Sequence, residues 1–218
     1  YYDEHQWSVS EFKQLIADIK ACGGMYVFPH PKDGSRFISE NPLDYYFADW
    51  VGLEVFYGPS YYAPTGERTV NAYNLWLDLL AAGKKLWATA GSDSHSAPNT
   101  YALTTIFSTE KNAVEHFEHG KQGDMTCGPV GIRMVMGDTL TGGETSFEGK
   151  RLSICVSDIH ESAFFADHTY SVKVIAGKDG AEQVVYSGQF DPLKPFYYGL
   201  DADNTCDYYR VEVYDESD

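Results

Sequence analysis

The sequence predicts an α/β domain over residues 1–125, followed by a small β-sandwich over residues 126–218. In the first part, segments with apolar residues at helical spacing alternate with short apolar strands, which is the pattern of a layered fold with parallel strands. Beyond about residue 125 the helical spacing ends, and short alternating runs separated by Gly, Asp and Pro take over. That pattern of short strands and turns is typical of a sandwich of antiparallel strands. We place the boundary within residues 123–128.

The first expected element is a helix over residues 8–24. Ser8 or Ser10 supplies a polar cap, and four apolar residues from Phe12 to Ile19 recur at the spacing of one helix face. A pair of glycines then ends the helix.

The remaining elements of the first part continue the alternation of strands and helices. They are expected, in order, as strand 25–28, helix 41–47, strand 52–58, helix 70–82, strand 85–90, strand 104–107 and a helix from Thr109 to Gly120. Parallel strands end at one edge of their sheet, and folds of this class place their functional sites there.

The second part is expected to consist of strands only. Its alternating runs cover residues 130–136, 152–156, 170–176, 183–186 and 208–214, and Lys178-Asp179-Gly180 is a hairpin signal between two of them.

The composition limits the classes of partner. Lys and Arg number 16 against 32 Asp and Glu, so the formal net charge is −16. Such a chain repels polyanions, and we expect neither nucleic acid nor a membrane surface as a partner. No stretch approaches the ~20 apolar residues of a spanning helix. We therefore expect a soluble protein that is cytoplasmic, or exported after removal of a signal.

The residues with the clearest chemical content follow predicted strands. Asp93 and His95 are alternate residues of an extended segment, so their side chains can converge on one metal ion. His30 lies between two prolines, which restrict its backbone. Because these motifs end parallel strands, we expect His30, Asp93 and His95 to share a metal site. The alternative is a structural histidine and an ordinary surface loop.

Glu54 and two further histidines are weaker candidates. Glu54 lies within an apolar strand, where a carboxylate needs a partner, so it is either a base or hydrogen-bond acceptor at the site or the partner of a nearby Arg or Lys. His116 and His119 have a spacing compatible with metal binding, but they flank Glu115 and Glu118, which favours a solvated helix face.

Three segments together resemble successive motifs of the PHP superfamily, which is named after polymerase and histidinol phosphatase. These are Gly24–Pro31, Gly52–Val55 and Gly91–His95. The segment Phe117–Pro129, which leads into the β-rich part, resembles the carbaryl hydrolase-like subfamily, in which a β-sandwich follows the catalytic domain. The resemblance covers about residues 8–130.

The resemblance implies the C-terminal part of a distorted (β/α)7 barrel that binds divalent metal ions such as Zn, Mn or Fe. These ions would activate water to attack a small phosphoester or a related ester. Carried over by position, His30, Asp93 and His95 would be metal ligands, and Glu54 would line the site as the catalytic candidate.

The sequence departs from the family at its beginning, because it holds no His-x-His motif. We therefore expect the C-terminal portion of a hydrolase, incomplete by itself and associated with an N-terminal half or with further copies. The alternative is a non-catalytic binding module with an incomplete metal site. Its sequence support is a set of tyrosines, Tyr197, Tyr198, Tyr208 and Tyr209, which could form a stacking surface if exposed and a sandwich core if buried.

Overall fold

A computed structural model describes residues 8–31, 51–57, 67–92, 102–128, 130–158 and 168–216. The chain divides into two compact units, Tyr1–Ala102 and Leu103–Asp218. The sequence patterns place this division near residue 125, whereas the structure assigns the segment from Leu103 onward to the second unit. The reason is an antiparallel pairing of Thr104–Ile106 with Met125–Cys127, which ties the two ends of that segment together.

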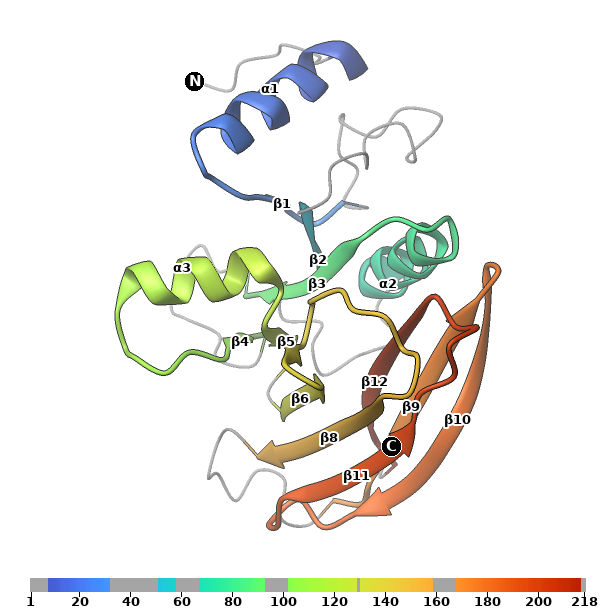
Figure 1. Cartoon of the computed structure of the whole chain (residues 1–218). Helices are drawn as coiled ribbons and strands as arrows, with labels where there is room; N and C mark the ends of the chain where they lie inside the picture. The colour runs from blue at the N-terminus through green and yellow to red at the C-terminus, as the bar shows by residue number, and fades with distance from the viewer. Residues whose placement is uncertain are drawn as a thin grey trace. The chain divides into compact units, whose positions relative to one another are not determined.

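The helices and strands follow in this order along the chain (Figure 1). The first unit contains α1 (Val9–Ala21), β1 (Tyr26–Phe28), β2 (Val51–Tyr57), α2 (Glu67–Ala81) and β3 (Leu86–Gly91). The second contains β4 (Thr104–Ile106), α3 (Ala113–Gln122), β5 (Met125–Cys127), β6 (Val130–Met136), β7 (Thr139–Leu140), β8 (Arg151–Asp158), β9 (Tyr170–Lys178), β10 (Ala181–Phe190), β11 (Phe196–Asp201) and β12 (Tyr208–Asp215). Among the residues described, no helix is both long and apolar enough to cross a membrane.

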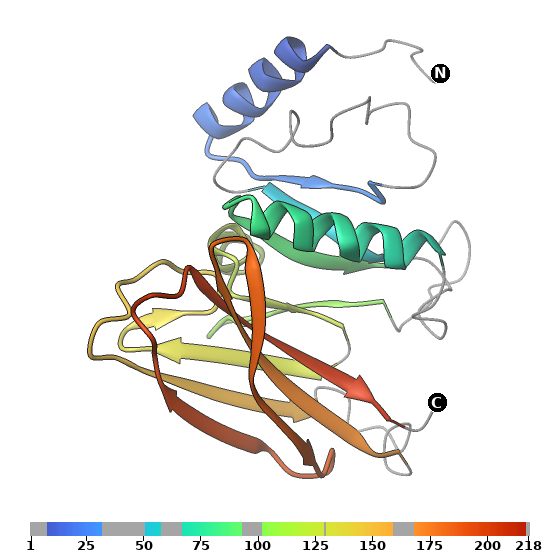
Figure 2. The ribbon, with the colours of Figure 1, turned by 90° about the vertical axis from the view of Figure 1, so that its right-hand side faces the viewer.

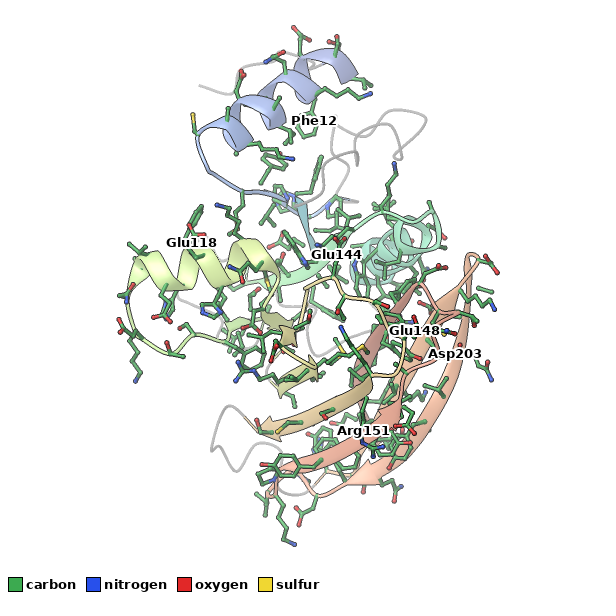
Figure 3. All side chains as sticks on the ribbon, in the orientation of Figure 1. Phe12, Glu118, Glu144, Glu148, Arg151 and Asp203 are labelled. Carbon is green, nitrogen blue, oxygen red and sulfur yellow. The ribbon has the colours of Figure 1, made fainter. Side chains whose placement is uncertain are left out.

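The first unit is built on a parallel sheet with the strand order β1-β2-β3. Phe28 pairs with Leu53, and Leu53 pairs with Ala88. Apolar side chains of these strands share one core with the apolar faces of α1 and α2. Phe12 lies on the face of α1 that is turned toward the strands (Figure 3), and its ring packs 5.0 Å from that of Phe28.

Local signals set the ends of α1. Ser8 accepts a hydrogen bond from the Glu11 backbone N–H, and the Glu11 carboxylate accepts one from the Ser8 backbone N–H, so the helix begins with a capping box. Cys22 ends the helix, and Gly23 follows at φ +76°, a left-handed conformation that favours glycine.

The expected C-terminal part of a distorted, TIM-like (β/α)7 barrel is wrong. The described part of the first unit holds one sheet of three strands, in which β1 and β3 are the edges. A barrel requires a closed ring of strands. The strand predicted at residues 104–107 does not extend the parallel sheet, because β4 pairs antiparallel with β5 in the second unit. Most of the strands in the described residues belong to the second unit, where the long pairings are antiparallel.

Two antiparallel sheets pack face to face in the second unit (Figure 2). Their strand orders are β10-β9-β12 and β11-β8-β6-β7. Alternate residues of the central strands point between the sheets, as in other sandwiches. The fully or nearly fully buried ones are Met136, Leu152, Ile154, Val156, Val172 and Val174, which form one cluster.

The helix of the second unit begins one turn later than Thr109. Asn112 caps α3, because its side chain accepts a hydrogen bond from the Glu115 backbone N–H. Thr109 instead donates its hydroxyl hydrogen bond to the Glu115 carboxylate. Gly123, rather than Gly120, ends the helix at φ +78°.

An ion-pair network covers the outer face of the sheet β10-β9-β12. The Arg210 side chain is only 9% exposed and donates hydrogen bonds to both carboxylate oxygens of Glu182. Glu212 accepts a further bond from Arg210, and the Tyr208 hydroxyl donates to Glu182 at 2.8 Å. The hydrogen bond from Arg210 holds the pKa of Glu182 below its usual value, although burial acts in the opposite direction.

Glu182→Gln is expected to lower the free energy of unfolding by about 1–3 kcal/mol at neutral pH, because the buried Arg210 guanidinium loses the negative charge of a carboxylate that it contacts with two hydrogen bonds. Since the pKa of Glu182 is lower in the folded than in the unfolded chain, its contribution is present above the unfolded pKa and is lost as the pH falls through the folded one. Urea unfolding of both proteins, followed by circular dichroism between about pH 7 and about pH 3, tests this.

The exposed Glu148 provides the matched control for that substitution. Glu148→Gln should leave the unfolding free energy nearly unchanged at every pH. A difference between the wild type and Glu182→Gln that stays constant down to acid pH would contradict the role given to the carboxylate charge.

Candidate functional site

Three neighbouring strands of the first unit have their carboxyl ends on the same side of their sheet, which we call the carboxyl edge. β1 ends at Phe28, two residues before His30, while β2 carries Glu54 and β3 ends at Gly91. Because β1, β2 and β3 are parallel, their carboxyl ends lie together. This is the edge at which open α/β sheets place ligands.

Glu54 holds the segment that follows β1. Its neighbours Leu53 and Val55 are fully buried in the core, and because side chains alternate along a strand, Glu54 points to the opposite face. The His30 backbone N–H donates a hydrogen bond to Oε2 of Glu54 over 2.7 Å. Sequence reasoning left open whether the partner of Glu54 would be a basic side chain, and the structure places a backbone N–H there.

His30 adopts a backbone conformation that is rare for a residue with a side chain. Its φ is +27°, between the flanking Pro29 and Pro31. Outliers of this kind cost on the order of 1–3 kcal/mol and persist where the surroundings hold them in place. The bond to Glu54 is one such restraint. The His30 side chain is half-buried, and its Nδ1 atom is buried.

The same carboxylate also touches the end of β3. A Cβ atom added at Gly91 would clash with Oε1 of Glu54. Glycine at this position therefore lets the carboxylate pack directly against the backbone of β3. Glu54 thus contacts the segments that follow or end both neighbouring strands, one through each of its oxygens.

The structure brings His30, Glu54 and Gly91 together, whereas Asp93 and His95 lie outside the described residues. Within the described ranges, no group of three or more His, Cys, Asp or Glu side chains could hold a metal ion. The described part of the edge therefore contributes one candidate metal ligand, His30. Imidazole and carboxylate donors are the ligand types that Zn, Mn and Fe accept, so the chemistry of the set His30, Asp93 and His95 suits such an ion.

His119 forms a polar cluster in the second unit that sequence reasoning missed. Its Nδ1 atom lies 3.0 Å from Oδ2 of Asp124, whose side chain is 1% exposed, and its Nε2 atom lies 3.7 Å from Glu115. His119 is therefore a partner of a buried carboxylate rather than part of a freely solvated face. The signal for this was Asp124 itself, an acidic residue placed directly after the Gly123 helix end.

The hydroxyl of Thr109 completes this cluster. Its hydrogen bond to Glu115 lowers the pKa of that carboxyl. Arg133 lies 4.0 Å from Asp124. The carboxylates of Asp124 and Glu115 therefore both have partners within the cluster, and we interpret the cluster as structural.

The four tyrosines of the second part do not form an exposed stacking surface. Tyr198 and Tyr209 pack against the sandwich core, and Tyr208 bonds Glu182. Only Tyr197 of the four is largely exposed, at 74%. Exposure distinguishes a binding surface from an aromatic core: Tyr198 and Tyr209 belong to the core, and Tyr208 is half-buried in the ion-pair network on the outer face of the sheet.

A polar hollow of about 310 Å³ lies on the second unit. Its lining consists of Thr145, Ser146, Phe147, Glu148, Asn204, Cys206 and Asp207. None of these is a site residue predicted from the sequence.

Comparisons with known proteins yielded no match to a family model, to a curated protein or to a solved structure.

Proposed function

We propose that this protein is a metal-dependent hydrolase of small phosphoesters or related esters, in which His30, Asp93 and His95 bind a divalent metal ion. The observation that carries the proposal is the contact of Glu54 with both neighbouring strand ends at the carboxyl edge of the parallel sheet. Two positions that are far apart in the sequence, His30 and Gly91, thereby contact one carboxylate.

The residues of this edge would have distinct roles. A bound divalent ion would polarise the ester and make water a stronger nucleophile near neutral pH. His30 would present its imidazole from a backbone restrained by Pro29, Pro31 and Glu54. Glu54 acts through the backbone of His30, so we assign it as a positioning residue.

The charge of the chain favours a small substrate over a polymeric anion. With a net charge of −16, the protein repels nucleic acids and polyphosphates at long range. A bound metal ion reverses the local charge at its own site, so a single phosphoester group remains compatible with the proposal.

Removing any of the three ligands is expected to weaken metal binding at least about tenfold, because even residues that only support metal ligands cost 10–100-fold when replaced, by the usual rough scale. The variants are His30→Ala, Asp93→Asn and His95→Ala. The measurements are zinc and manganese binding by calorimetry and metal-dependent hydrolysis of p-nitrophenyl phosphate. Matched controls are His116→Ala and Asp138→Asn, which lie in the second unit.

The two readouts separate the parts of the proposal. Equal metal binding by the ligand variants and the wild type would show that these residues are not ligands. Metal binding that depends on them without hydrolysis of any phosphoester would leave a binding site and reject the enzymatic function.

A further inference from the structure

Among the described strands, β10 is an edge strand whose second side is unpaired. In the strand order β10-β9-β12, β9 is the only described strand that pairs with β10, along the whole length Ala181–Phe190 (Figure 1). Its other side presents backbone N–H and C=O groups in the direction in which a further strand would pair. At ten residues, β10 is the longest strand described.

Apart from one β-bulge, this edge lacks the features that usually prevent association. Edge strands are commonly short, or carry Lys or Pro that block pairing with another chain. From Gln183 to Phe190 the strand holds neither a charged residue nor a proline. Its single charged side chain, Glu182, is engaged by Arg210. The stretch 183–190 is therefore uncharged, although the whole chain has a net charge of −16.

Apolar side chains are exposed beside this open edge. Val184 is 50% exposed and Val185 is 40% exposed. The register shifts between Val184 and Tyr186, which marks a β-bulge. Bulges can protect an edge, and this one lies in the middle of the strand, but the half beyond it, Tyr186–Phe190, continues in unbroken register with β9.

The inward side chains hold β10 in place. The ring of Tyr186 stacks on Tyr198 of β11 at 3.8 Å, and the ring of Phe190 lies 6.0 Å from that of Phe196. An edge that is already ordered loses little conformational entropy when a partner strand binds.

We propose that β10 pairs antiparallel with β10 of a second copy of this chain, so that two three-stranded sheets join into one. A two-fold axis across the edge places the neutral stretch 183–190 against itself, so no like charges face each other despite the acidity of both chains. A basic or an acidic partner would find no complementary charge on this stretch. Self-pairing would also cover part of the exposed surface of Val184 and Val185.

Sedimentation equilibrium of the whole chain tests the proposal. We expect a dimer whose fraction rises with concentration, and slowed hydrogen exchange of β10 amides in the dimer. Val185→Lys and, separately, Ser187→Lys should weaken dimerisation at least about tenfold, because a two-fold axis brings the new positive charges near each other. Val114→Lys on α3 is the matched control, since Val114 is 74% exposed, and it should leave the dissociation constant unchanged.

Circular dichroism is used to check that each variant is folded. Two separate edge variants are made so that the test still works if one of them fails to fold. A wild type that stays monomeric up to about 100 μM, where a micromolar dimer would be saturated, would overturn the proposal. So would folded Val185→Lys and Ser187→Lys variants that dimerise as tightly as the wild type.

Discussion

Leu53→Ala is expected to lower the free energy of unfolding of the first unit by about 2–5 kcal/mol, the usual range for removing a buried leucine side chain. Leu53 is fully buried on β2, in the core that includes Phe12, Phe28 and Leu79. Alanine would leave a cavity between the sheet and the helices.

The tryptophans make this effect specific to one unit. All four, at positions 7, 50, 76 and 87, belong to the unit Tyr1–Ala102. Tryptophan fluorescence during urea unfolding therefore reports on the first unit, whereas far-ultraviolet circular dichroism reports on both units, because each contains helices and strands. Leu53→Ala should shift the fluorescence transition to lower urea by the amount expected from its unfolding free energy.

Ile154→Ala is the matched substitution in the other core. Ile154 is 2% exposed between the two sheets, so a loss of similar size is expected in the second unit. It should shift the transition seen by circular dichroism and leave the fluorescence transition in place. If both substitutions shifted both transitions equally, the assignment of a separate core to each unit would be wrong.

The local elements of the first unit could be predicted from the sequence because each depends on neighbouring residues. The helix expected over residues 8–24 is α1, and its start at Ser8 follows from the spacing of Ser8 and Glu11. The closure of a barrel depends instead on pairing between distant strands, which no local pattern specifies. The segment 104–107 illustrates this, since its pattern indicated a strand but not its antiparallel partner β5.

The candidate site shows the same limit. The positions of His30 and Glu54 relative to their strands could be predicted from apolar runs. The bond between them spans 24 residues, and it depends on the register of β1 against β2 and on the φ of His30. Similarly, the spacing of His116 and His119 was visible, but the burial of Asp124 against His119 required the packing of α3 with the strand after it.

Gly142→Ala is expected to destabilise the second unit by about 2–4 kcal/mol. Two effects add. Gly142 has a φ of +77°, which costs a residue with a Cβ atom about 1 kcal/mol. The new Cβ would also lie 2.6 Å from the carbonyl oxygen of Gln122 and still closer to the Gly123 backbone. These are backbone atoms at the end of α3, which cannot rotate away as a side chain can, so overpacking adds about 1–3 kcal/mol.

Gly149→Ala separates the two effects. Gly149 has a similar φ of +66°, but an added Cβ there would meet nothing within 4 Å. It should therefore lose only the conformational part, about 1 kcal/mol. Urea unfolding followed by circular dichroism gives both values, and their difference measures the steric contact between the turn after β7 and the end of α3. Equal losses for the two variants would mean that the chain relaxes around residue 142, and that this contact is not tightly packed in solution.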